Sequence, residues 1–332
     1  MNANLETATR SRQTTGDRYA EIISRYLGPT ITGFFADDDV TEIYVNPQEV
    51  TVRVDTRSRG KITTAERMSS HRVEMLLNAV AASIGENLTP ENPRLQAELP
   101  KPVFRGSRLQ GFVSPLTAGP SFTIRKPPTV IYSLDDYVAC SVITAAQRDQ
   151  LRTAVAEHRS IVVAGGTNTG KTTLANALLR EITLQFPHER LVLLEDTVEL
   201  QCAASDHLAL RTNGCVTLAD LVRNTLRTSP DRIIVGEVRG AEALDLLDAW
   251  ATGHPGGIAT VHASSVEGAL LRLDRLAQRA NVPPQAELVA EAVGLVVVIE
   301  GGNARRRVSE IARVDGRYAD GRYRFLYAKE TA

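Results

Sequence analysis

The run GGTNTGKT at residues 165–172 constrains the fold of this chain more than any other feature, because it matches the pattern G-x-x-x-x-G-K-[ST]. Residues 160–164, just before it, form a short apolar run rich in β-branched side chains, which predicts a buried strand. Residues 173–180, just after it, place apolar side chains at helical spacing. A strand, a glycine loop and a helix in this order are the setting that a phosphate-binding loop requires. We therefore expect an α/β domain that binds a nucleoside triphosphate.

The chemistry of this loop predicts ATP and Mg²⁺ as bound cofactors. Glycines let backbone N–H groups approach an anion without a Cβ clash, and the N-terminus of the helix adds partial positive charge. Lys171 is expected to reach the β- and γ-phosphates, and the Thr172 hydroxyl to ligate Mg²⁺. The predicted nucleotide-binding residues of the loop are Gly165, Gly166, Thr167, Asn168, Thr169, Gly170, Lys171, Thr172 and Thr173.

Charge and apolar content narrow the class of protein. The net charge is −1, which disfavours a globally basic nucleic-acid binder but leaves a local basic patch possible. Residues 1–13 lack an apolar signal core, and the longest apolar run, residues 293–299, is too short to cross a bilayer. Three widely spaced cysteines, Cys140, Cys202 and Cys215, predict buried, reduced thiols. We expect a cytoplasmic protein that reaches a membrane only through partners.

The length of 332 residues and a change of rhythm along the chain predict two domains. Residues 43–54 alternate apolar and polar side chains around a turn, which predicts a hairpin, and residues 73–84 show helical spacing. Further strand-like pieces lie near residues 108–113 and 121–125. The predicted organisation is a disordered tail over 1–17, a small α+β domain over 18–126, a linker over 127–136 and a P-loop ATPase domain over 137–332.

The second half of the chain alternates strands and helices. Residues 191–194, 232–235 and 258–261 are continuous apolar runs, typical of strands buried on both faces of a parallel sheet. Thr217 and Asp220 predict a capping box at the start of one helix. Since ligands bind at the carboxyl ends of strands in such sheets, residues that follow these runs are candidates for chemistry.

An acidic segment follows the first of these strands. Glu195, Asp196 and Glu199 are expected to face the glycine loop, where they would hold Mg²⁺ through waters or orient an attacking water. The alternative is a solvated acidic turn.

A second acid follows residues 232–235. Gly236 stands where phosphate-loop ATPases often carry an aspartate, and Glu237 comes next. We interpret Glu237 as the residue that activates the hydrolytic water, against the alternative that it only pairs with Arg239 or another arginine. The predicted metal ligands are Thr172, Glu195 and Glu237, and the predicted catalytic residues are Glu237, Lys171, Glu195, Glu199 and His262.

Histidines and arginines complete the candidate set. His262 ends a strand and is interpreted as a γ-phosphate sensor, although a lone histidine is more often structural, and His254 is a weaker candidate. A phosphoryl transition state needs cations beyond Lys171. The candidates are Arg227 and Arg239 in the second domain and Arg108 and Arg125 in the first, with solvated faces as the alternative, while Arg305, Arg306 and Arg307 are interpreted as a solvated turn.

The four blocks of the second domain, in this order, resemble the secretion-ATPase superfamily of type II and type IV secretion systems and type IV pili. The stretches that carry the resemblance are residues 195–204, 230–240, 241–247 and 252–263, and residues 27–29, 40–47 and 121–127 are similar in outline. Two departures are Asn168-Thr169, where the family usually carries Gly-Ser, and the missing glycine after Pro47. The resemblance is strongest to conjugal-transfer members.

The resemblance implies a RecA-like ATPase that forms a cytoplasmic homohexameric ring at the inner membrane. Its two domains would clasp ATP, and hydrolysis would drive pilus assembly or substrate transfer with inner-membrane components of a type IV secretion apparatus as partners. The alternatives are a motor of a type IV pilus or a type II secretion system, a nucleic-acid translocase, and a non-hydrolysing scaffold. The charge balance and the lack of an aromatic, basic groove disfavour the translocase.

Overall fold

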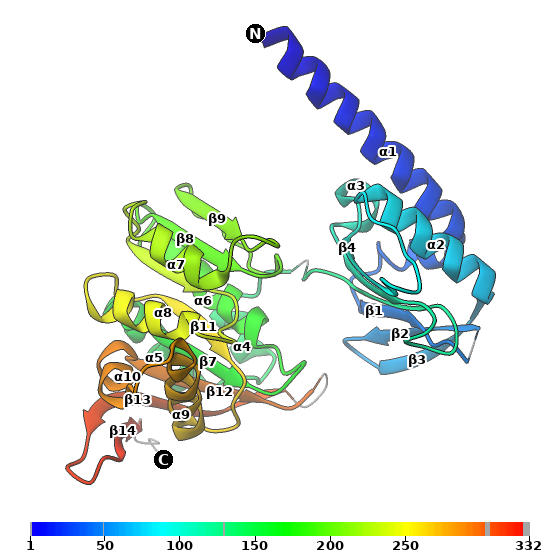
Figure 1. Cartoon of the computed structure of the whole chain (residues 1–332). Coiled ribbons are helices and arrows are strands. Elements are labelled where there is room, and N and C mark those ends of the chain that lie inside the picture. The colour runs from blue at the N-terminus through cyan, green and yellow to red at the C-terminus, as the bar shows by residue number, and fades with distance from the viewer. Residues whose placement is uncertain (1, 49, 129, 303–305, 328–332) are drawn as a thin grey trace. The chain divides into compact units, whose positions relative to one another are not determined.

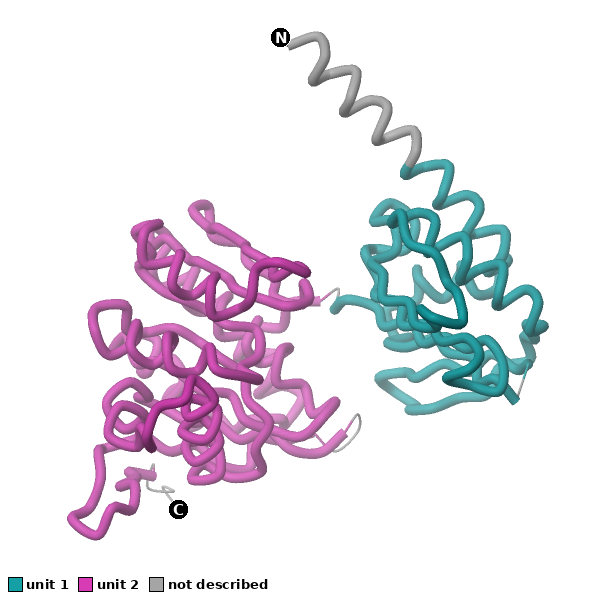
Figure 2. Tube along the Cα trace, in the orientation of Figure 1, with its two compact units in different colours: residues 1–129 teal, residues 130–332 magenta. Residues whose placement is uncertain are grey.

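The structure is a computed structural model that describes residues 2–48, 50–128, 130–302 and 306–327, with only the backbone of residues 2–15. The predicted disordered tail falls largely outside the residues described with side chains and stays a prediction. The chain divides into two compact units, residues 1–129 and 130–332 (Figure 2), which are described separately.

The first unit is built on a six-stranded sheet in the order β3-β2-β1-β6-β5-β4, with antiparallel pairs throughout. Helices α1 and α2 pack against each other (Figure 1). Helix α1 is interrupted at Gly28, whose φ of 75° and ψ of 167° are not helical, as expected before Pro29. The elements are α1 (Asn2–Gly33), β1 (Val40–Val45), β2 (Thr51–Thr56), β3 (Gly60–Arg67), α2 (Ser70–Ser83), β4 (Arg94–Glu98), α3 (Lys101–Phe104), β5 (Arg108–Phe112) and β6 (Ser121–Arg125).

The second unit contains an eight-stranded sheet in the order β14-β13-β12-β7-β11-β10-β8-β9. The six strands from β12 to β9 are parallel, and β13 and β14 extend the sheet as an antiparallel hairpin. The strands are β7 (Ile161–Gly165), β8 (Leu191–Glu195), β9 (His207–Arg211), β10 (Arg232–Val235), β11 (Ile258–Val261), β12 (Leu295–Glu300), β13 (Arg307–Arg317) and β14 (Tyr323–Tyr327). The helices are α4 (Leu134–Ala139), α5 (Ala145–Ala156), α6 (Lys171–Gln185), α7 (Leu218–Thr225), α8 (Glu242–Ala251), α9 (Val266–Ala277), the 3-10 turn η1 (Gln278–Ala280) and α10 (Ala286–Ala292).

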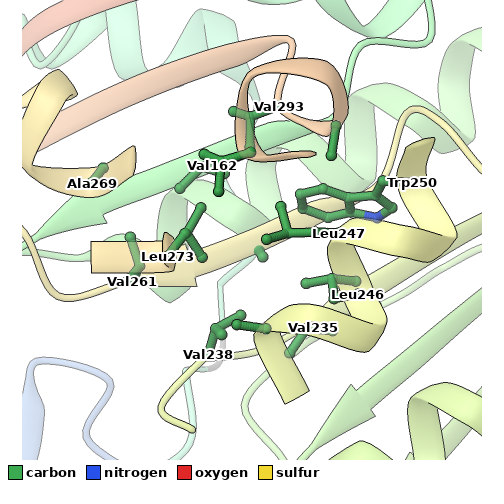
Figure 3. Close-up of a cluster of buried hydrophobic side chains, with 14 of the residues drawn as sticks. Val162, Val235, Val238, Leu246, Leu247, Trp250, Val261, Ala269, Leu273 and Val293 are labelled. Carbon is green, nitrogen blue, oxygen red and sulfur yellow. The ribbon is translucent and has the colours of Figure 1, made fainter. Parts of the chain in front are cut away.

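Two hydrophobic cores form on this sheet, because successive side chains of a buried strand point to opposite faces. In β7, Val162 belongs to the core that includes α7, α8, α9 and α10, while Ile161 and Val163 belong to the core that includes α4, α5 and α6. Trp250 of α8 lies in the first core (Figure 3), and its indole N–H donates to the carbonyl of Ile233 at 3.2 Å. Because helices cover both faces of the sheet, its polar groups lie at the ends of the strands.

A buried ion pair lies at the amino ends of the parallel strands, opposite the glycine loop. The Arg232 side chain is fully buried, and its Nε lies 2.5 Å from an oxygen of Glu189. Its guanidinium also lies over the ring of Phe186, 4.7 Å from the centroid. This pairing lets an arginine begin an otherwise apolar strand.

Among the described residues, no helix is long and apolar enough to cross a membrane. The three cysteines are free thiols, but Cys140 and Cys215 are exposed and Cys202 is half-buried, so the expectation that they are buried is wrong. Cys140 ends α4 and Cys215 lies in a polar turn, both outside the two apolar cores, whereas Cys202 packs partly against the core that includes α4, α5 and α6.

Candidate functional site

The glycine loop lies at the carboxyl end of β7, in the middle of the parallel sheet. Gly170 precedes the first helical residue of α6 and has a φ of 97°, a left-handed conformation that favours glycine. No side chain caps this helix, so its first N–H groups face the loop without a side-chain acceptor. An anion placed there would accept hydrogen bonds from these groups and be stabilised by the helix dipole.

Asn168 shows how the loop accommodates a departure from its usual sequence. Its φ of 61° is left-handed, a conformation that asparagine adopts more readily than most residues. The next residue, Thr169, donates its hydroxyl to the carbonyl of Gly166 at 3.0 Å. Asn168 therefore fits the left-handed turn of the loop, and Thr169 adds a bond that closes it.

The Lys171 ammonium is folded into the loop. Its side chain is buried, and Nζ donates to the carbonyl of Gly166 at 2.8 Å and lies 3.4 Å from Nδ1 of His262. Lys171 is thus placed inside the curve of the loop, where a phosphate held by the backbone amides would meet it. His262, at the end of β11, is brought to the same point from a different strand.

The acidic segment is attached to helix α6 through two polar side chains. The Thr172 hydroxyl donates to a carboxylate oxygen of Glu199 at 3.1 Å. One turn on, buried Asn176 donates to the Glu199 carbonyl at 3.1 Å and accepts from the amide of Gln201 at 2.9 Å. Sequence reasoning missed Asn176, although a polar residue within an apolar helix was a signal. The result is that Glu199 is the carboxylate beside Thr172.

Glu195 is buried, and one of its carboxylate oxygens accepts the amides of Glu199 and Leu200 at 2.9 and 2.7 Å. Burial raises the pKa of Glu195 to about 7, against the lowering effect of these two hydrogen bonds and with a contribution from the charge of Glu199. A Cβ added at Gly236 would lie 3.1 Å from Cγ of Glu195. The Glu195 side chain, at the end of β8, therefore lies where a side chain at position 236, after β10, would have to fit.

Glu237 lies between a histidine and an arginine. One carboxylate oxygen accepts from Nη2 of Arg239 at 2.6 Å, and the other lies 2.8 Å from Nε2 of His262, without the alignment of a hydrogen bond. Burial acts to raise the pKa of Glu237, but the hydrogen bond and charge of Arg239, with the charges of His262 and Lys171, outweigh it and hold the pKa below its ordinary value. Glu237 is therefore an ionised carboxylate whose second oxygen, beside His262, accepts no hydrogen bond in the structure.

The three late arginines have different surroundings. Arg305 lies outside the described residues. Arg307 is an exposed residue at the start of β13 and pairs with Glu300 at 2.6 Å. Arg306 departs from the expected solvated turn, because its guanidinium lies against Gly170 of the loop and its Nε is buried. The pairing of β13 with β12, and of β12 with β7, brings it there.

The remaining predicted residues have other surroundings. Nδ1 of His254 donates to the carbonyl of Pro230 at 3.0 Å, before β10 begins, so His254 lies at the opposite end of this strand from Glu237. Arg227 is exposed at the end of α7. Arg108 and Arg125 belong to the first unit, where they face each other across the paired strands β5 and β6.

The residues present fit a metal that also binds phosphate. Among the described residues no group of three or more His, Cys, Asp or Glu side chains could hold a metal alone. Thr172 and Glu199 together offer a hydroxyl and a carboxylate, and Mg²⁺ is commonly held by one or two such ligands plus substrate phosphates and waters. Glu195 already accepts two amides, so it is placed as a support of this segment.

The family model described as type II/IV secretion system protein matches residues 18–301. The chain belongs to this family. It is 42% identical over 306 residues to a probable conjugal transfer protein TrbB of Sinorhizobium fredii, covering 92% of each chain. It is 41% identical over 290 residues to the conjugal transfer protein TrbB of Rhizobium radiobacter, covering 87% of this chain and 88% of that one.

The fold agrees with that of a solved ATPase structure. The crystal structure of the Legionella pneumophila ATPase DotB superposes with a TM-score of 0.61 at 21% identity, covering 84% of this chain and 78% of that chain. This likeness confirms the predicted fold class, a RecA-like P-loop domain preceded by a smaller α+β domain.

Proposed function

We propose that this chain is the Mg²⁺-dependent ATPase of a conjugative type IV secretion apparatus. The observation that carries the proposal is the convergence of Lys171, Glu237 and His262, from three separate elements, at one glycine loop. The similarity to conjugal transfer proteins over 92% of the chain supports the conjugative role.

In the proposed reaction the loop amides from Gly166 to Thr173 and the Lys171 ammonium bind the phosphates of ATP. Thr172 and Glu199 would hold Mg²⁺, which neutralises charge on the phosphates when bound. Glu237 orients the attacking water by accepting its proton, since Arg239 keeps this carboxylate ionised. His262 lies between Lys171 and Glu237, so it is placed to respond to the γ-phosphate.

The remaining parts of the proposal concern assembly. Arg108 and Arg125 stay predicted nucleotide contacts from the first unit. We propose a homohexameric ring that works in the cytoplasm and docks on inner-membrane components of the apparatus. The relatives' names support a role in conjugal transfer, and deletion of the gene with a mating assay is the direct measurement of it. Unchanged mating frequency would contradict the conjugative part alone.

A turnover assay tests the enzymatic part. Glu237→Gln should bind ATP with little change and hydrolyse it about a hundredfold to ten-thousandfold more slowly, the usual size of a general-base effect. Lys171→Ala should lose tight ATP binding. Glu267→Gln, an exposed residue of α9, is the control that should keep normal turnover. Normal hydrolysis by the Glu237→Gln protein would refute the role given to Glu237.

A further inference from the structure

Of the two described arginines of the late turn, Arg306 is the one that the solvated-turn interpretation does not explain. If a Cβ is placed on Gly170, it lies 2.8 Å from Nε of Arg306 and 2.9 Å from Cζ. The guanidinium therefore packs directly on the backbone of the phosphate loop, and only a glycine permits this approach. The contact is with the residue that immediately precedes α6.

The hydrogen-bonding state of this guanidinium is unusual. Nε of Arg306 is buried and has no partner, and within the described ranges no carboxylate pairs with Arg306. A buried donor without an acceptor costs free energy, so native structures rarely keep one without a reason. The neighbouring Arg307 does have a carboxylate, Glu300, and Arg239 has Glu237. Arg306 is thus an uncompensated cation next to a loop built to bind an anion.

A second orphan group lies close by. The hydroxyl of Tyr137, from α4, is also buried without a partner. The charge of Arg306 is near enough to lower the pKa of this hydroxyl, while burial, the larger effect, raises it. An unsatisfied donor of α4 therefore lies within reach of the charge of Arg306, which itself packs on Gly170. A ligand bound in the loop would supply the acceptor that Nε of Arg306 lacks.

We propose that Arg306 is a nucleotide-binding residue that donates to the α- and β-phosphates of the nucleotide. The assignment to these phosphates follows from its contact with Gly170, because the backbone amides of this type of loop hold the α- and β-phosphates while the lysine reaches the β- and γ-phosphates. A guanidinium suits this position, since its planar fork presents two parallel donors to phosphate oxygens. The inference rests on the proposed function, as it requires a nucleotide in the loop.

The test is calorimetric titration of ATP and ADP, with Mg²⁺ present, into the purified full-length protein and three variants. Arg306→Gln should bind both nucleotides about tenfold to a hundredfold more weakly, the usual effect of losing a hydrogen bond to a charged group. Arg306→Lys keeps the charge but not the fork, and it should lose at least about fivefold for both. Arg307→Gln, which changes the next residue, at the start of β13, should bind like the wild type.

The outcomes separate this inference from the proposed function. If the wild type binds ATP and both Arg306 variants bind as well as it does, the inference is wrong and the proposed function stands. A loss for ATP but not for ADP would place Arg306 on the γ-phosphate and overturn the assignment. An equal loss in Arg307→Gln would show a general disturbance of the β12–β13 connection and would also overturn it. A wild type that binds neither nucleotide would remove the proposed function itself.

Folding of the variants is checked by the fluorescence of Trp250, which is buried in the same unit. If Arg306→Gln unfolds, Arg306→Lys still decides the question, because wild-type affinity in that variant would refute a directed contact by the guanidinium.

Discussion

Replacing Glu195 with glutamine should change how the stability of the second unit depends on pH. Glu195 is only 6% exposed, and burial raises its pKa from 4.5 to about 7. The folded protein therefore holds this proton more tightly than the unfolded chain does. The resulting stabilisation is complete below pH 4.5 and is lost as the pH rises to about 7.

The size of the effect follows from the two pKa values. Each pH unit of difference is worth about 1.4 kcal/mol, so the loss of stability amounts to about 3 kcal/mol. Glutamine keeps an oxygen that can accept the amides of Glu199 and Leu200, and it has no proton to lose. Across this pH range the free energy of unfolding of Glu195→Gln should therefore rise by about 3 kcal/mol relative to that of the wild type.

Urea unfolding followed by tryptophan fluorescence measures this difference at each pH. Trp250 is the only tryptophan of the chain and lies in the same unit as Glu195, so the signal reports that unit. Glu291→Gln, which changes an exposed carboxyl of α10, serves as control and should follow the wild type. Parallel pH profiles of wild type and Glu195→Gln would show that the Glu195 carboxyl is not held in its protonated form, and the reasoning would fail.

Two further variants test the backbone of the loop and the charge of the candidate base. Asn168→Ala should lower the free energy of unfolding by about 1–2 kcal/mol, because alanine resists the left-handed conformation. Asn168→Gly should change the free energy of unfolding by less than about 1 kcal/mol. If thermal unfolding showed the alanine variant to be the more stable of the two, the left-handed conformation of Asn168 would be contradicted. Arg239→Gln should raise the pKa of Glu237, since burial then lacks its main counterweight. The acid limb of the ATPase pH profile should move to higher pH, and an unmoved limb would show that Arg239 does not set this pKa.

The parts of the structure that are fixed by neighbouring residues could be predicted from the sequence. The strand, loop and helix around residues 161–185, the hairpin of β1 and β2, and the capping box of Thr217 and Asp220 are all present. Each depends on side-chain periodicity or on hydrogen bonds within a few residues, so the pattern alone determines it. The proximity of Lys171 and Glu237 could be predicted because the carboxyl ends of parallel strands lie on the same side of the sheet.

Features fixed by distant contacts could not be predicted in this way. Strand β4, with alternating exposed and buried positions over only five residues, is recognised by its pairing with β5. Arg306 reaches the loop because two strand pairings bring the chain back to β7, and a run of three arginines gives no sign of this. The bond between Asn176 and the acidic segment joins residues about two dozen positions apart, so the polar residue alone did not identify its partner.

The two acids at the ends of β8 and β10 have opposite electrostatic surroundings, and this difference supports the roles proposed for them. Burial raises the pKa of Glu195 to about 7, while Arg239, His262 and Lys171 keep Glu237 ionised. Two carboxyls whose pKa values are pushed apart can serve one site in different protonation states. Gly236 makes this possible, because any side chain there would meet Glu195. The ionised acid is therefore the one that can take a proton from water, and the buried acid organises the segment that carries Glu199.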